Sequence, residues 1–139
     1  MPRTSNRGRK AKPATFDTVR QFALALPGVQ EGMSYGTPAF RVKGKFLGRM
    51  REDGDSFVIK IDFDEREFLM KADSETFYIT DHYLGYPAML IRLSKVHSEE
   101  LRRLIEQAWR RLAPKKLAAS AMAKTNADSM RLKKKKERL

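Results

Sequence analysis

The strongest indication of an antiparallel sheet comes from residues 40–61, whose sequence is FRVKGKFLGRMREDGDSFVIKI. Apolar and polar side chains alternate over residues 40–43, and residues 57–61 repeat an apolar side chain at every second position, as strands with one buried face do. Gly44 allows a tight turn between two such strands, and residues 52–55 form a second turn signal. The pattern predicts an antiparallel meander.

Helices are predicted before and after this meander, from N-cap residues and apolar stripes. Thr15 is a candidate N-cap of a first helix, and Pro27 ends that helix. Asp64 is a candidate N-cap of a second, short helix. Ser98 is expected to cap a last helix, in which apolar residues recur at helical spacing until Pro114.

Two further strands are predicted at residues 77–80 and 88–93, between the second and third helices. The element order is therefore α-β4-α-β2-α, which indicates one α+β domain whose antiparallel sheet is flanked by helices. Six large apolar residues are expected to share one core: Phe22, Phe40, Phe57, Ile59, Leu104 and Trp109.

The net charge of +12 lies in the two ends of the chain. Residues 1–14 hold five Lys or Arg and no acid, residues 115–139 hold nine Lys or Arg against two acids, and the stretch between them is balanced. The first of these ends lacks large apolar side chains, so it is expected to be disordered. We predict one domain at residues 15–117, between a basic N-terminal tail at 1–14 and a basic C-terminal tail at 118–139.

The composition argues against several function classes. The chain has no cysteine, which excludes disulfides and thiolate zinc sites and favours a cytoplasmic location. No segment approaches the roughly 18 apolar residues of a membrane-spanning helix. The two histidines are His82 and His97, and the acids Asp62, Asp64 and Glu65 fit a helix start better than a cation site. We therefore expect no catalytic or metal site, no cofactor and no enzymatic activity.

The predicted hairpin that follows Gly32 is strongly basic. It has no acid, and its cations are Arg41, Lys43, Lys45, Arg49 and Arg51. Because side chains two apart share a face of a strand, Arg41 and Lys43 are expected to point to solvent if Phe40 faces the core. A two-stranded basic ribbon of this kind can enter a nucleic-acid groove or follow a phosphate backbone. The same cations would also suit a sheet face that is merely solvated.

A second candidate site surrounds the loop between the last two predicted strands. Its members are Tyr78, His82, Tyr83 and Tyr86. These side chains would line a ligand pocket or stack on nucleic-acid bases. They would equally suit half-buried packing at a sheet edge, with the hydroxyl groups in water. The sequence leaves both interpretations open.

The tails add candidate contacts to nucleic acid. Arg7, Gly8 and Arg9 resemble the core of an AT-hook, whose arginines lie along a narrow minor groove, although Lys10 stands where the hook has proline. A non-specific basic arm is the alternative interpretation. Four consecutive lysines in the C-terminal tail would bind nucleic acid, anionic lipid or acidic protein: Lys133, Lys134, Lys135 and Lys136.

Several motifs of the predicted domain resemble the bacterial MmcQ/YjbR family. They are LPGV at 26–29, YGTPAFRV at 35–42, GKF at 44–46, GYP at 85–87 and APK at 113–115. The resemblance covers about residues 15–117 and implies an antiparallel sheet with helices packed against it. It also implies a double-wing arrangement and DNA binding, and it brings no established catalytic residues. The long basic tails are not part of the family's core pattern.

These observations together favour a DNA-binding protein. The expected partner is double-stranded DNA, contacted mainly at its phosphates by the basic tails and the basic hairpin. The alternative is a protein-interaction or small-ligand-binding module that uses the aromatic loop at residues 78–87.

Overall fold

The computed structural model describes residues 14–117. In chain order its elements are α2 (Phe16–Leu24), β1 (Val29–Ser34), β2 (Thr37–Val42), β3 (Lys45–Met50), β4 (Ser56–Lys60), α3 (Phe63–Ala72), β5 (Phe77–Tyr78), the 3-10 helix η1 (Asp81–Tyr83), β6 (Ala88–Arg92) and α4 (Ser98–Leu112). The predicted order α-β4-α-β2-α is confirmed, with η1 added between the last two strands. The candidate tail residues Arg7, Arg9, Lys10 and Lys133–Lys136 lie outside the described residues.

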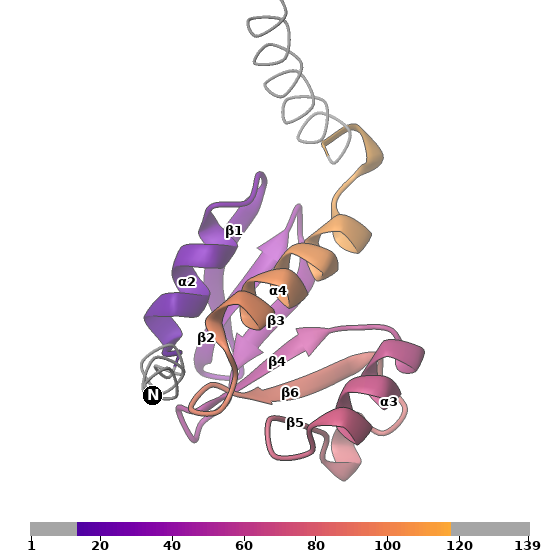
Figure 1. Cartoon of the computed structure of the whole chain (residues 1–139). Coiled ribbons are helices and arrows are strands. Elements are labelled where there is room, and N and C mark those ends of the chain that lie inside the picture. Colours follow the sequence, from indigo (N-terminus) through magenta and orange to yellow (C-terminus); the bar gives the residue numbers. More distant parts are fainter. Residues whose placement is uncertain (1–13, 118–139) are drawn as a thin grey trace, which may run out of the picture.

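The six strands of this range form one antiparallel sheet with the order β1-β2-β3-β4-β6-β5. Figure 1 shows α2 and α4 side by side against one face of the sheet, and α3 beside β5 and β6. A smaller apolar cluster lies on the opposite face: Val58, Ala88 and Leu90, packed against Tyr78 and Tyr83. The predicted α+β fold is therefore confirmed, and none of the helices of residues 14–117 is long and apolar enough to span a membrane.

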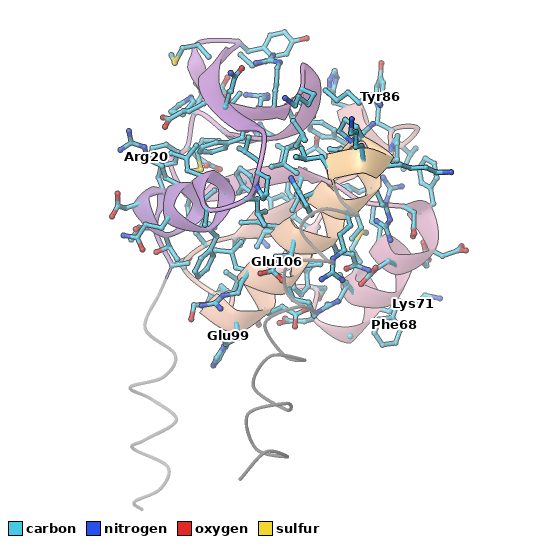
Figure 2. The ribbon with its side chains drawn as sticks, turned by 90° about the horizontal axis from the view of Figure 1, so that it is seen from above. Arg20, Phe68, Lys71, Tyr86, Glu99 and Glu106 are labelled. Carbon is cyan, nitrogen blue, oxygen red and sulfur yellow. The ribbon has the colours of Figure 1, made fainter. Side chains whose placement is uncertain are left out.

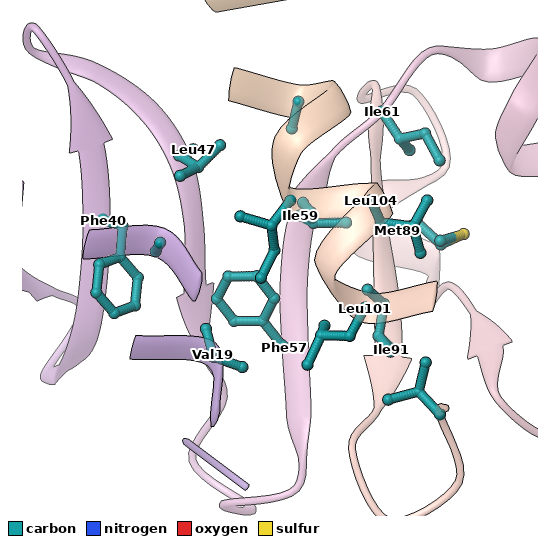
Figure 3. Packing of buried hydrophobic residues seen from close by; sticks show 14 of the residues in the cluster. Val19, Phe40, Leu47, Phe57, Ile59, Ile61, Met89, Ile91, Leu101 and Leu104 are labelled. Atoms are coloured by element: carbon teal, nitrogen blue, oxygen red, sulfur yellow. The ribbon is translucent and has the colours of Figure 1, made fainter. Parts of the chain in front are cut away.

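The main core lies between the sheet and the helices α2 and α4 (Figure 3). Phe40, Phe57 and Ile59 come from the strands and are fully buried, and Leu104 meets them from α4. The rings of Phe40 and Phe57 pack edge to face, with their centroids 6.4 Å apart. The structure therefore confirms that these four residues share one core. The alternation of apolar and polar side chains in the strands and the apolar stripe of the last helix predicted it.

Of the other two predicted core residues, Trp109 belongs to this cluster and Phe22 packs against it. Trp109 is buried, and its indole N–H donates to the carbonyl oxygen of Pro27 at 2.8 Å, which fixes α4 against the segment after α2. Phe22 is only partly buried and packs against the cluster from α2. The guanidinium of Arg102 covers the Phe22 ring at 5.0 Å from its centroid.

A β-bulge in β3 determines which residues of the central hairpin face the core. β2 advances by one residue where β3 advances by two, so Leu47 is an additional residue in β3. Leu47 is buried in the core, whereas Phe46 and Arg49 on either side of it both lie on the opposite face of the sheet. Strict alternation would have separated Phe46 and Arg49, because they are three positions apart.

Two helix starts differ from the sequence prediction. Asp62 rather than Asp64 caps α3, and its carboxylate accepts a hydrogen bond from the backbone N–H three residues on, at 2.8 Å. His97 rather than Ser98 caps α4, and its Nδ1 accepts from the N–H two residues on, at 3.3 Å. In each case the capping residue is the last one with an extended backbone, from which a side chain reaches the free N–H groups. The predicted cap at Thr15 is confirmed.

Candidate functional site

A cleft of about 730 Å³ lies on the face of the sheet opposite α2 and α4. Residues of β2, β3 and β4 form its floor, and the loop between β5 and β6 forms one wall. Its charged lining residues are four cations and one carboxylate: Arg41, Arg49, Arg51, Lys60 and Glu52. Five rings line it as well: Tyr35, Phe46, His82, Tyr83 and Tyr86. The basic hairpin and the aromatic loop, which were separate candidates in the sequence, therefore meet in one cleft.

The cations of the floor come from strand positions that face away from the core. Arg41 in β2 stands between buried neighbours. Lys60 ends β4 and stands between the buried residues Ile59 and Ile61. Lys60 was not selected from the sequence, although the alternation over residues 57–61 already indicated that its side chain faces away from the core.

Arg49 is more enclosed than Arg51, with 12% of its side chain exposed against 31%. One terminal nitrogen donates to the Thr37 hydroxyl and to the Met50 carbonyl oxygen, each at 3.1 Å. The other donates to the Tyr83 hydroxyl at 3.4 Å. The guanidinium also lies 5.2 Å from the centroid of the Tyr35 ring. Arg49 thus connects the β1–β2 turn to the aromatic loop and uses most of its donors within the protein.

The carboxylate that lines the cleft neutralises the cations incompletely. The carboxylate of Glu52 lies 3.8 Å from a terminal nitrogen of Arg49 and 3.9 Å from Nε of Arg51. Both distances are longer than a hydrogen bond. The Glu52 side chain is 64% exposed, so water screens both pairs. Within residues 14–117, Nε of Arg51 donates no hydrogen bond, and no carboxylate pairs with Arg41 or Lys60. The cleft therefore keeps an excess of positive charge.

The aromatic wall of the cleft is formed by three rings, and the His82 ring contacts the other two. The His82 ring stacks on the Tyr86 ring at 5.9 Å between centroids and meets the Tyr83 ring edge to face at 4.8 Å. Tyr86 is 59% exposed, and Figure 2 shows its side chain at the surface of the molecule. The strand predicted at 77–80 ends at Tyr78, and the chain enters η1 soon after it. The loop therefore presents an exposed ring at the rim of the cleft.

Arg66 in α3, which was not among the residues predicted for the site, donates hydrogen bonds to the backbone of this loop. Arg66 is 7% exposed, and its guanidinium donates to four carbonyl oxygens of the loop: Tyr83 at 3.0 Å, Leu84 at 3.1 Å, Tyr86 at 2.7 Å and Ala88 at 3.0 Å. No carboxylate of residues 14–117 pairs with it. A buried cation is tolerated when its donors are satisfied, and here the loop carbonyls satisfy them. In the sequence, Arg66 had the pattern of an ordinary solvated helix residue.

Two of the predicted cations lie away from the cleft. Lys43 and Gly44 have positive φ angles of 50° and 86°, as the two central residues of a type I′ hairpin turn do. Lys43 therefore belongs to the turn and not to a strand, and Lys45 starts β3; both side chains are exposed and neither lines the cleft. The hairpin does not form a separate ribbon, because β2 and β3 pair with β1 and β4 and lie inside the sheet.

Tyr78 lies on the same face of the sheet but does not line the cleft. The guanidinium of Arg92 covers its ring at 3.9 Å from the centroid. Its hydroxyl lies 2.6 Å from Oγ of Ser56. Half-buried packing, which was one of the two interpretations of the aromatic residues, therefore describes Tyr78.

The turn between β3 and β4 contains a carboxylate with a shifted pKa. Burial raises the pKa of Asp53, but hydrogen bonds donated by the backbone N–H groups of Asp55 and Ser56 outweigh it, together with the Ser56 hydroxyl. The pKa of Asp53 therefore lies below its usual value. These hydrogen bonds stabilise the turn that follows Glu52.

Comparison with known proteins gives one family and one shared fold. The YjbR family model matches residues 24–111. Uncharacterized proteins of Mycobacterium bovis and Mycobacterium tuberculosis are 34% identical to the chain over 71 residues, which are 50% of this chain and 55% of each relative. The match thus spans about half the length of these curated relatives.

A solved structure shares the arrangement of helices and strands. It is the crystal structure of the Deinococcus radiodurans protein DR2400, whose domain is described as DUF419. The two chains superpose with a TM-score of 0.64 and are 20% identical, over 76% of this chain and 82% of the other. At this identity the likeness concerns the fold.

Proposed function

The chain belongs to the YjbR family, as its motifs suggested, and we propose that it binds DNA mainly through contacts to phosphates. The observation that carries the proposal is the cleft, in which Arg41, Arg51 and Lys60 stand among aromatic rings with one loosely paired carboxylate. The proposed role is binding in the cytoplasm, without catalysis or a cofactor.

The cleft cations differ in how free they are to contact a phosphate. Arg49 already uses most of its donors within the protein. Arg41 and Lys60 pair with no carboxylate of residues 14–117, and Arg51 has only the distant Glu52. A guanidinium matches phosphate oxygens with two parallel donors, and an ammonium adds a compact charge. We therefore assign phosphate contact to Arg41, Arg51 and Lys60, and a positioning role to Arg49.

The basic ends of the chain are expected to add affinity without sequence preference. Residues 1–14 hold five cations and residues 115–139 hold nine, and such segments contact phosphates regardless of the base sequence. In this proposal the tails hold the protein near DNA, and the cleft determines how the domain is placed on it. The tails are expected to contact the phosphates of double-stranded DNA, and the AT-hook-like Arg7–Arg9 would lie in its minor groove.

A second candidate function is the binding of a small ligand in the same cleft. A volume of about 730 Å³ lies within the usual range for small-molecule sites, about 300–1,000 Å³. The rings of His82, Tyr83 and Tyr86 would contact an apolar or aromatic part of such a ligand. The cations would then bind an acidic group on it.

DNA binding is tested by measuring the anisotropy of a labelled short duplex with the full chain, between about 50 and 200 mM salt. One variant combines Arg41→Gln, Arg51→Gln and Lys60→Gln, which removes three cleft charges. The matched control combines Lys71→Gln, Lys95→Gln and Arg110→Gln, which removes three exposed charges that do not line the cleft. Both variants change the net charge equally.

The salt dependence separates the outcomes. Each phosphate contact adds about 0.9 to the slope of log K against log salt on duplex DNA, so the cleft variant is expected to lower the slope by up to about 3. The control is expected to change it little. Equal slopes in the two variants would contradict a role for the cleft in binding the duplex. A wild-type chain that fails to bind the duplex at about 50 mM salt would contradict the binding of double-stranded DNA.

A further inference from the structure

We infer that the cleft binds an unpaired segment of a DNA strand, with at least one base stacked on the aromatic wall. The inference rests on the proposed function and names its substrate class. It starts from two features of the cleft: exposed rings at its border, and cations that line it.

The exposed rings stand on two different elements that border the cleft. Tyr35 comes from the turn between β1 and β2 and is exposed, and Tyr86 comes from the loop before β6 and is also exposed. Tyr86 is supported from behind by the stacked ring of His82. A ring fixed in this way loses little freedom when another planar group stacks on it.

One cation connects Tyr35 to the aromatic wall, and two others line the same cleft. Arg49 reaches the Tyr35 ring on one side, at 5.2 Å, and the Tyr83 hydroxyl on the other side, at 3.4 Å. Arg41 and Lys60 line the same cleft and pair with no carboxylate of residues 14–117. Rings next to free cations match a single strand, in which base faces and phosphates alternate along one backbone.

An intact duplex would contact only part of the cleft. Its base pairs are stacked on one another, so their faces cannot contact Tyr35 or Tyr86, and the wall rings would have no partner. Its phosphates lie on the convex outer surface of the helix, whereas the cations here line a cleft. Unpaired bases can enter the cleft with their faces against the rings. The geometry therefore favours a single strand over a duplex.

The test compares a labelled oligothymidine strand with a duplex of the same length, each titrated with the full chain at one salt concentration. The critical variant is Tyr86→Ala, and its matched control is Phe68→Ala. Phe68 is 69% exposed but belongs to α3 and does not line the cleft, and Figure 2 shows Phe68 and Tyr86 at separate places on the surface. Tyr86→Phe keeps the ring and removes only the hydroxyl.

We expect the strand to bind more tightly than the duplex. Tyr86→Ala is expected to weaken strand binding by about 5- to 150-fold, the change that loss of one base–aromatic stacking contact produces. Phe68→Ala and Tyr86→Phe are expected to bind like the wild type. Tyr86→Ala should leave the salt slope unchanged because no charge is lost, whereas Arg41→Gln should lower it by about 0.7 on the strand.

Three results would overturn the inference: a duplex that binds as tightly as the strand, a Tyr86→Ala variant that binds the strand as tightly as Phe68→Ala does, or thymidine monophosphate that binds as tightly as the strand. The last result would identify a free nucleotide as the occupant. A duplex that binds when the strand does not would leave the proposed DNA binding intact. Failure of both to bind would reject the proposed function as well.

Discussion

Replacing Arg66 with methionine is expected to lower the free energy of unfolding by about 2–5 kcal/mol. The guanidinium is buried and donates hydrogen bonds to four carbonyl oxygens of the loop at residues 83–88. Methionine is flexible and apolar, fills much of the space of the aliphatic stem, and donates no hydrogen bond. The substitution therefore keeps most of the packing and removes the donors.

The magnitude follows from how buried the four hydrogen bonds are. The bond to Ala88 is buried, and a buried acceptor left without a donor costs about 1–3 kcal/mol. The other three bonds are partly buried, so water replaces the guanidinium in part, and each loss costs about 0.5–1 kcal/mol. Removing the guanidinium also removes its own desolvation cost, which lowers the total.

Urea denaturation measures this change through the fluorescence of Trp109, which is the single tryptophan and is buried. Lys71→Met is the matched control, because it replaces an exposed cation of the same helix with the same residue. It is expected to change the free energy of unfolding by no more than about 0.5 kcal/mol. Native-state hydrogen exchange at residues 83–88 is expected to be faster in Arg66→Met only.

Two results would refute the reasoning. An Arg66→Met protein as stable as Lys71→Met would show that the loop is held by its own packing and not by the guanidinium. A loss of stability with unchanged exchange at residues 83–88 would show that Arg66 stabilises some other part of the fold. Arg66→Lys is expected to fall between wild type and Arg66→Met, because one ammonium with three donors cannot reach four carbonyls.

Four further predictions concern single residues. Gly48→Ala should destabilise the fold by about 1–3 kcal/mol in urea denaturation, because the added Cβ would lie 2.6 Å from the carbonyl oxygen of Val58. Leu104→Ala should cost about 2–5 kcal/mol in the same assay, since the residue is buried in the core; a loss below about 1 kcal/mol would contradict that placement. The folded-state pKa of Asp53 is lowered, so its stabilising effect is present above its unfolded pKa and is lost as pH falls through the folded value. The stability difference between wild type and Asp53→Asn should therefore shrink below about pH 4 and stay constant from pH 6 to about 8. Glu52→Gln should strengthen DNA binding by about two- to fivefold, because it removes the carboxylate near Arg49 and Arg51, and unchanged affinity would show that Glu52 does not oppose a bound phosphate.

Much of the fold was predictable because the pattern of apolar and polar residues along the chain indicated it. The alternation over residues 40–43 and 57–61 identified two strands and their buried faces, and the spacing of apolar residues after Ser98 identified the last helix. The prediction of the capping residues was less precise. Asp62 and Asp64 are both carboxylates near a helix start, and only the backbone geometry shows which of them precedes the first turn.

The candidate site was predicted in two pieces that the sequence did not connect. Arg41, Arg49 and Arg51 were selected for their charge, and the loop residues for their rings. The bulge at Leu47 changes the phase of β3, so that Arg49 shares a face with Phe46, and no residue pattern in β3 indicated this.

From its sequence alone, this protein can be assigned its order of helices and strands, its charge-balanced domain between two basic ends, and its resemblance to the YjbR family. All three depend on residue types and on neighbours a few positions apart. The cleft depends on pairing between distant segments: Lys60 pairs with Ala88 across β4 and β6, which brings the loop before β6 to the cations of the sheet. The burial of Arg66 depends on the same loop, because only in the folded chain do its carbonyl oxygens converge on one guanidinium.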